Sequence, residues 1–291
     1  MKRPVFFLLF LVACLAGHSQ ATDPQPEKKT RKFHVGVSYT YLSTDMKITS
    51  LTMHSVWQGQ DFGTSEATGD ELDDINSFVK RTGTVNGISL EAGMVLLSKP
   101  TTNFHIEGDL IAGIANSYTR IYNKNSGKEE QTFNSGLKKP FLGLKFDITY
   151  RFTPAWGLSL RPLFACTWGV TTDITDDIYP PAENFTETRT DDFFFTYHRS
   201  NLMATFTVKR FTVAIGPGFY LVQTNHKYKI NRTNNESGYL LTDEFNSKLV
   251  STAFIDGAIA LEWRIIDLLT LTASGAFGAD VTASAGLRCN F

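Results

Sequence analysis

The last eleven residues, Val281-Thr282-Ala283-Ser284-Ala285-Gly286-Leu287-Arg288-Cys289-Asn290-Phe291, alternate in character with a period of two. Every odd position is apolar, whereas every even position is small, polar or charged. Because successive side chains of a β-strand point to opposite faces, this alternation predicts a strand with one apolar face and one polar face. The apolar face continues to the C-terminal residue.

An apolar face that ends in a C-terminal Phe resembles the final strand of bacterial outer-membrane β-barrel proteins, which include porin-like and OmpA/OmpX-like barrels. In that class the final strand is the insertion signal that the barrel-assembly machinery reads. The resemblance assigns this role to Val281, Leu287, Cys289 and Phe291. It also implies the outer membrane of a Gram-negative bacterium as the location, with the lipid bilayer and the assembly machinery as partners.

The N-terminus has the pattern of a secretory signal peptide. Lys2 and Arg3 precede an apolar run, and small residues follow at a cleavage site near Ala21. We expect a signal peptide over 1–21, a disordered periplasmic leader over 22–32 and a barrel domain over 33–291. The segment 11–14 also resembles a lipobox, so acylation of Cys14 stays open. No later segment approaches the ~20 consecutive apolar residues that a membrane-spanning helix needs.

The alternation of the last strand recurs along the whole chain. Apolar side chains occupy every second position in segments that begin at Phe33, Ile88, Phe104, Leu142, Leu158, Leu202, Phe211, Leu249 and Leu269. With the terminal strand, these segments predict about ten strands, within a range of about eight to twelve. Strands of this length, with apolar residues on one phase, argue against a soluble β-sandwich.

The connections between these segments alternate in length. Tight turns near 99–102, 153–156, 209–210 and 265–267 alternate with long polar stretches near 53–82, 124–136, 173–191 and 229–247. The pattern predicts an all-β fold, a transmembrane antiparallel up-and-down β-barrel with short periplasmic turns, long extracellular loops and periplasmic termini. The barrel has to close because lipid offers no partner for unpaired backbone groups.

If the apolar phase faces lipid, the opposite phase faces the lumen, and that phase is strongly charged. The predicted lumenal charges are His105, Glu107, Asp109, Lys145, Asp147, Arg151, Arg161, Asp256, Glu262, Arg264 and Arg288. Opposite charges at similar depth should pair, because an unpaired charge in a confined site costs several kcal/mol. We therefore expect a charge-filled lumen and no open pore. A gate or binding site built from His105, Glu107, Asp109 and Arg161 stays an alternative.

The first long polar stretch contains a helix signal. Thr68-Gly69-Asp70-Glu71 fits a capping box, and Leu72, Ile75, Phe78 and Val79 recur at helical spacing towards Gly83. The sequence therefore predicts a short amphipathic helix here. It either lies over the barrel mouth or stiffens a long loop.

An enzymatic site is not supported by the residues. The segment 139–144, with Tyr150-Arg151 and Asp176-Asp177-Ile178-Tyr179, is locally similar to omptin proteases. Ile178 stands where the omptin pattern has a His, so the base that would activate water is missing. His198 and Ser200 share a strand face, but nothing marks an oxyanion hole. The six His residues show no metal-ligand spacing. We predict no catalytic, cofactor or metal site.

The functional hypotheses follow from these observations. A net charge of -1 and the lack of a long basic cluster argue against nucleic acid as a partner. The first hypothesis is a monomeric, non-enzymatic outer-membrane surface protein that acts in envelope integrity or in loop-mediated interaction. The alternatives are a narrow channel or transporter for small solutes and, third, an omptin-like hydrolase.

Overall fold

The computed structural model describes residues 32–98, 103–134, 139–172, 185–278 and 281–291. The predicted signal peptide and all but the last residue of the predicted leader lie outside them. The described elements are β1 (Phe33–Trp57), β2 (Gln60–Glu66), α2 (Gly69–Phe78), β3 (Val79–Ser98), β4 (Phe104–Asn123), β5 (Glu129–Asn134), β6 (Lys139–Arg151), β7 (Trp156–Thr172), β8 (Phe185–Val208), β9 (Phe211–Asn234), β10 (Leu240–Ser251), β11 (Ile255–Ile266), β12 (Leu269–Phe277) and β13 (Val281–Asn290).

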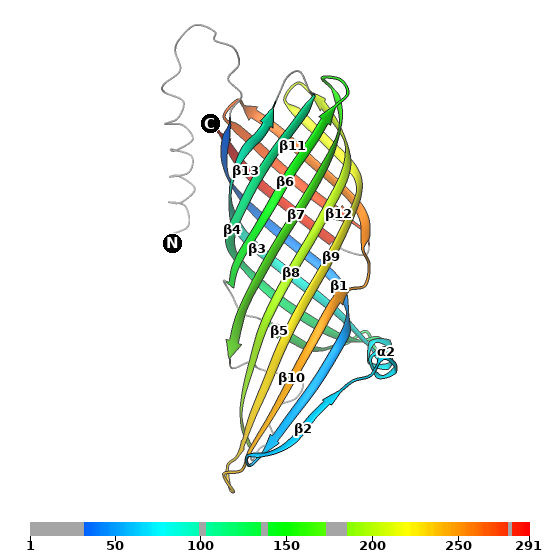
Figure 1. The fold of residues 1–291 in the computed structure, drawn as a ribbon, viewed down its shortest axis with the longest axis vertical. Coiled ribbons are helices and arrows are strands. Elements are labelled where there is room, and N and C mark those ends of the chain that lie inside the picture. Colours follow the sequence, from blue (N-terminus) through cyan, green and yellow to red (C-terminus); the bar gives the residue numbers. More distant parts are fainter. Residues whose placement is uncertain (1–31, 99–102, 135–138, 173–184, 279–280) are drawn as a thin grey trace.

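The strands form a closed ring of antiparallel pairs. From β1 the ring passes through β3, β4, β6, β7, β8, β9, β11, β12 and β13, and β13 pairs again with β1. At the closure the backbone N–H of Phe291 donates to the carbonyl of Phe33 at 2.8 Å. The predicted antiparallel up-and-down barrel of about ten strands is confirmed, and Figure 1 shows its strands tilted steeply around the barrel.

The outer surface carries the apolar phase that the sequence predicts. Exposed side chains on this phase include Val35, Ile88, Leu90, Leu110, Leu142 and Leu144. Exposed aromatic rings lie near the short turns, where aromatic side chains of membrane proteins meet the headgroups: Phe33, Phe104, Phe152, Trp156, Phe206, Phe211, Trp263 and Phe291. Cys289 lies on the same phase but is fully buried. Among the described residues, no helix is long and apolar enough to cross a bilayer.

The barrel narrows with distance from the short turns. β13 pairs with β1 only from His34 to Ser43, and from Met46 onwards β1 pairs with β10 instead. Three residues, 252–254, separate β10 from β11, and β11 continues between β9 and β12. At the level of Met46 the described ring consists of eight strands: β1, β3, β4, β6, β7, β8, β9 and β10. The short β12–β13 hairpin therefore widens one end of the barrel only.

The narrow part of the barrel is filled by an apolar cluster, which we call the lumenal core. Its buried members are Leu42, Met46, Ile48, Val85, Ala115, Ala165, Phe193, Phe195, Tyr197, Tyr220, Val222 and Leu249. An interior of eight strands is just wide enough for side chains to fill, which explains why the core forms here. The charged lumen that the sequence predicts is therefore present only in the wider half of the barrel, near the short turns.

The predicted helix is present as α2, and it fills a gap between two strands. The backbone N–H of Thr68 donates to Glu71 Oε2 at 2.6 Å, as in a capping box. The helix ends at Phe78, short of Gly83, because β3 begins at the next residue. The β1–β3 ladder stops at Met46, and Asn76 of α2 then bonds both the N–H and the carbonyl of Ile48. The helix therefore stiffens the wall where β1 and β3 separate.

Candidate functional site

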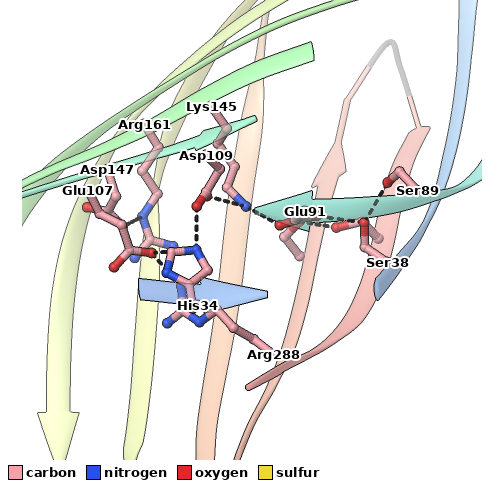
Figure 2. Close-up of polar contacts among 12 residues, drawn as sticks. His34, Ser38, Ser89, Glu91, Glu107, Asp109, Lys145, Asp147, Arg161 and Arg288 are labelled. Carbon is pink, nitrogen blue, oxygen red and sulfur yellow. Dashed lines mark hydrogen bonds and ion pairs between the residues drawn. The ribbon is translucent and has the colours of Figure 1, made fainter. Parts of the chain in front are cut away.

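The wider half of the lumen holds a group of ion pairs that we call the lumenal network (Figure 2). Its members are His34, Glu91, Glu107, Asp109, Lys145, Asp147, Arg161, Glu262 and Arg288. They come from β1, β3, β4, β6, β7, β11 and β13. All of them lie on the phase opposite to the lipid-facing side chains, so the pleat of the strands directs them inwards.

The centre of the network is Asp109, and its geometry depends on a glycine. In the strand register His34 lies opposite Gly93, and Gly93 lies opposite Asp109. Because Gly93 has no side chain, the imidazole of His34 reaches over β3 and its Nε2 lies 2.5 Å from Asp109 Oδ1. On the other side, Lys145 Nζ lies 3.0 Å from Asp109 Oδ2 and 2.7 Å from Glu91 Oε2. The carboxylate of Asp109 is thereby held from both sides.

Other members of the network connect strands that are not neighbours in the sheet. Arg288 of β13 donates to Glu107 of β4 at 2.5 Å, across the intervening β1 and β3. Arg161 of β7 donates to Glu262 of β11 at 3.0 Å and contacts Asp147 at 2.8 Å. Arg161–Asp147 joins the neighbouring strands β7 and β6, whereas Arg288–Glu107 and Arg161–Glu262 cross the barrel interior. They tie opposite sides of the lumen together.

The network contains more carboxylates than permanent cations. Glu91, Glu107, Asp109, Asp147 and Glu262 face Lys145, Arg161 and Arg288. His34 lies within reach of two of the carboxylates, Asp109 and Glu107. With His34 neutral, the network thus contains two more negative than positive charges, an imbalance that favours cations over anions.

Three of these side chains have ligand atoms close enough together for a metal ion. The ligand atoms of His34, Glu107 and Asp109 all lie within 4.8 Å of one another. However, Lys145 Nζ binds Asp109 Oδ2 at 3.0 Å and Arg288 Nη1 binds Glu107 Oε1 at 2.5 Å, so both carboxylates already have a protein cation as partner. In this arrangement the two carboxylates take part in an ion-pair network.

A second buried ion pair lies where the barrel narrows. Arg199 Nη2 donates to Asp256 Oδ1 at 2.6 Å, and both side chains are almost completely buried. Arg199 also donates to Asn201 Oδ1 at 2.8 Å and to Tyr197 Oη at 3.2 Å. Asp256 is the second residue of β11, directly after the break between β10 and β11. The pair therefore fastens β8 to the start of β11.

The structure brings most of the predicted lumenal charges together. Glu107, Asp109, Lys145, Asp147, Arg161, Glu262 and Arg288 meet in the network, and His105 lies at its edge, 3.5 Å from Glu107. Asp256 belongs to the separate pair with Arg199. Arg151 and Arg264 are exposed at the short-turn rim and form no ion pair within the part of the chain that the structure describes. They lie at the end of their strands, beyond the depth of the network.

Three participants were missed by the sequence reasoning: His34, Glu91 and Arg199. Each lies on the inward phase of a strand, next to lipid-facing residues such as Val35, Leu90 and His198. The alternation rule that found Asp109 and Arg161 would also have found these three. For Arg199 the signal was weaker because both phases of β8 are rich in aromatic residues.

A small cavity of about 200 Å³ lies between the network and the lumenal core. Glu91, Lys145 and Arg161 line it from the polar side, and Leu42 and Phe195 line it from the apolar side. The lumenal network and the lumenal core thus follow one another along the barrel axis, with this cavity between them.

No protein-family model and no curated protein matches the chain. The chain is similar to the solved structure of the outer membrane protease OmpT from Escherichia coli, with 10% identity and a TM-score of 0.42, over 94% of this chain and 100% of that one. It is also similar to the transport unit of the autotransporter AIDA-I from Escherichia coli, with 12% identity and a TM-score of 0.37, over 97% of both chains. A third similar structure is the outer membrane protein OprG from Pseudomonas aeruginosa, with 9% identity and a TM-score of 0.35, over 90% of this chain and 97% of that one.

Proposed function

We propose that the protein is a monomeric outer-membrane barrel with a sealed lumen, and that it acts as a non-enzymatic surface protein through the part that projects from the membrane. The N- and C-terminal ends of the barrel face the periplasm in this proposal. The observation that carries it is the double filling of the lumen. One half holds the lumenal network and the other half holds the lumenal core.

The lumenal core is the tighter of the two seals. Phe193, Phe195 and Val222 are at most 3% exposed, so water has almost no access to them from either side. An ion that crosses this level would leave water and enter an apolar interior, at a cost of many kcal/mol. The network adds a second barrier, because an ion that passes it has to separate direct contacts such as Lys145–Glu91 and Arg288–Glu107.

Beyond the core, several strands continue into what we call the extension, residues 50–78, 185–192 and 224–248. From Val222 to the end of β9 at Asn234 the strand advances about 40 Å at ~3.3 Å per residue. The outer face of the extension carries the charged pair Lys227–Glu244 at 3.0 Å, and a second pair, Lys80–Asp45 at 2.9 Å, lies on the outer face next to its base. Charges on this face are unfavourable in lipid, so we place the extension in water. Figure 1 shows β1, β2, β9 and β10 tapering to its tip.

The tip of the extension presents aromatic side chains to solvent. Trp57, Phe62 and Tyr239 are each about half exposed. Trp57 packs against Phe62 with ring centroids 6.3 Å apart and against Tyr239 at 6.5 Å. Trp and Tyr are enriched among the residues that contribute most to protein interfaces. This cluster supports an interaction role for the extension.

The arrangement of His198 and Ser200 supports the non-enzymatic assignment. Both residues lie on the outward phase of β8, and the ring of His198 packs edge-on against Phe164 with centroids 5.2 Å apart. A hydrolase that used this pair would have to work on the outer wall of the barrel, without a pocket for substrate. The pair therefore does not form a catalytic site.

Conductance of the purified protein in planar lipid bilayers tests the proposal. We expect no steady open-channel current from the wild-type protein. A variant that removes part of the core, Phe193→Gly with Phe195→Gly, should show current bursts only when the network is also weakened by Arg161→Gln. A steady wild-type current comparable to that of a general porin would refute the sealed lumen.

The interaction role has its own test. The triple variant Trp57→Ala, Phe62→Ala, Tyr239→Ala should fold and insert as the wild type does, because these side chains are exposed at the tip. It should lose the envelope phenotype that a strain carrying the wild-type protein shows, for example resistance to detergent. Full function of the triple variant would contradict the assignment of the tip.

A narrow channel for small solutes is the second candidate. The cavity of about 200 Å³ and the excess of carboxylates around it favour this function, because both would suit a small cation. Swelling of liposomes in solutes of graded size distinguishes the two: uptake of a small cation without uptake of sugars would favour the channel.

A further inference from the structure

A second cavity, which we call the chamber, lies on the far side of the lumenal core, at the base of the extension. Its volume is about 280 Å³. Most of its wall is aliphatic or aromatic, contributed by Ile48, Ile121, Ile230, Phe245 and Leu249 among others. Ile48 and Leu249 also belong to the lumenal core, so the core forms the floor of the chamber.

The notable group in this apolar wall is the guanidinium of Arg81. Arg81 lies near the start of β3, opposite Met46 of β1 and Ile121 of β4, and it is only 7% exposed. Its hydrogen bond to Asn76 Oδ1 is long, at 3.4 Å, and the same oxygen accepts the N–H of Ile48 at 3.0 Å. A guanidinium has five N–H donors, so most of the donors of Arg81 are not used by this contact.

Arg81 has no carboxylate partner within 4.0 Å among the residues that the structure describes. The other two arginines that are buried to the same degree do have such partners: Arg189 pairs with Glu187, and Arg199 pairs with Asp256. A buried cation without a counter-ion is costly, so we expect Arg81 to lower the stability of the barrel when no anion is bound.

The chamber wall also contains one carboxylate, Asp191, but that charge is already paired. His226 Nδ1 lies 3.1 Å from both carboxylate oxygens of Asp191, and the two residues lie on the neighbouring strands β8 and β9. Asp191 therefore does not neutralise Arg81. The remaining polar lining consists of hydroxyl groups such as those of Thr119 and Ser247.

We propose that the chamber binds a small organic anion with an apolar body, and that Arg81 holds its carboxylate. The planar guanidinium matches a carboxylate with two parallel N–H···O bonds, which are among the strongest hydrogen bonds in proteins. The aliphatic and aromatic wall accommodates the body of the ligand. A cavity of this size lies near the lower end of the range for ligand pockets, so it suits an aryl or short alkyl carboxylate rather than a long-chain lipid.

This site goes beyond the proposed surface role. A sealed barrel that works only through its exposed tip needs neither the chamber nor a buried arginine inside it. The chamber also lies outside both fillings of the lumen, so ligand binding and conductance are measured separately. Failure of one proposal does not imply failure of the other.

The test compares two probes of the same shape on the same protein. 4-Phenylbutyrate carries the carboxylate, and 4-phenylbutanamide is its uncharged counterpart. With the purified full-length barrel in detergent micelles, titration calorimetry should give a dissociation constant at least ~10-fold lower for the carboxylate than for the amide. Equal affinity for the two probes, or no binding of either, would overturn the proposal without any variant.

Two variants locate the binding group. Arg81→Met should remove the preference for the carboxylate, so that both probes bind with the affinity of the amide. Arg120→Met is the matched control, because Arg120 is exposed on the neighbouring strand β4 and lies over the ring of Tyr118 at 4.9 Å. The control should keep the wild-type preference. If Arg120→Met loses the preference as Arg81→Met does, the effect does not come from the chamber.

Stability separates a ligand-binding role from a structural one. If Arg81 is retained for a ligand, Arg81→Met without ligand should have a urea unfolding midpoint equal to or higher than that of the wild type. 4-Phenylbutyrate should raise the midpoint of the wild type and not that of Arg81→Met. A midpoint of Arg81→Met well below that of the wild type, with no shift of the wild type by 4-phenylbutyrate, would make Arg81 a structural residue and refute the site.

Discussion

Removal of Arg199 should destabilise the barrel more than removal of any exposed charge. Arg199→Met preserves most of the volume of the side chain but takes the guanidinium away from Asp256. The carboxylate of Asp256 is completely buried, and its Oδ2 has no hydrogen-bond partner among the described residues even in the wild type. The variant therefore leaves a buried charge without compensation.

The expected cost of Arg199→Met is about 3–5 kcal/mol in the free energy of unfolding, the usual range when one partner of a buried pair is removed. Loss of the hydrogen bonds to Asn201 and Tyr197 contributes about 0.5–1.5 kcal/mol each within that total. The double variant Arg199→Met, Asp256→Leu also removes the stranded charge. It should recover a large part of the loss and stay within about 1–2 kcal/mol of the wild type.

Reversible urea unfolding in lipid vesicles, followed by tryptophan fluorescence, measures these free energies. Lys80→Met serves as the control, because the Lys80–Asp45 pair is exposed and should contribute at most about 1 kcal/mol. Two results would refute the reasoning: a loss below about 1 kcal/mol in Arg199→Met, or a double variant less stable than the single one. The second result would show that the contacts of Asp256, and not its charge, stabilise this region.

Three further predictions address other parts of the molecule. In Gly93→Ala the new methyl group would clash with both Asp109 and His34, so the urea midpoint should fall by the equivalent of about 1–3 kcal/mol. In the control Gly275→Ala the methyl group would be at ordinary van der Waals distance from its neighbours, so the midpoint should hardly change. Leu287→Arg places a charge on the lipid-facing phase of β13 and should make insertion into vesicles less favourable by about 1–3 kcal/mol, seen as loss of the heat-modifiable band on gels. If Leu287→Arg inserted as well as the wild type, the lipid-facing and lumenal phases of β13 would have been assigned the wrong way round. Burial acts to raise the pKa of Glu187, but hydrogen bonds from its two arginine partners outweigh this effect and hold it below its usual range. The stability that the Glu187 carboxylate contributes is therefore complete above about pH 4.3 and is lost as the pH falls through the lowered pKa. Over this acidic range, amide exchange at the outer end of β8 should accelerate in the wild type and less in Glu187→Gln.

The alternation of single strands was enough to predict the barrel and its lipid-facing phase. Leu142 and Leu144 on β6, for example, lie on the outer surface as their spacing predicts. The narrowing could not be predicted in this way, because it depends on which distant strand pairs with each half of β1. The lumenal core could not be predicted from the alternation either, for a local reason. In Phe193-Phe194-Phe195 both phases are apolar, so alternation cannot distinguish a lipid-facing ring from a buried one.

The charges of the site were only partly predictable. The inward phase identified Asp109 and Lys145, because opposite charges on neighbouring strands have to meet in a narrow interior. Their depth along the barrel depends on strand tilt and register, which single-strand patterns do not contain. Arg151 was therefore assigned to the interior, although it is exposed at the end of β6, at the rim. The contact between His34 and Asp109 depends on Gly93 between them, and only the register of three strands reveals it.

The division of β1 between two partners has a consequence for assembly. Ten residue pairs join β1 to β13, and eleven join it to β10. A slip by one residue in either ladder would turn charged lumenal side chains towards lipid and apolar ones inwards. Because β10 continues through β11 and β12 into β13, an error in one ladder has to be matched by the same error in the other. Closure of the barrel thus requires β1 to pair in the correct register with two different strands, β13 and β10.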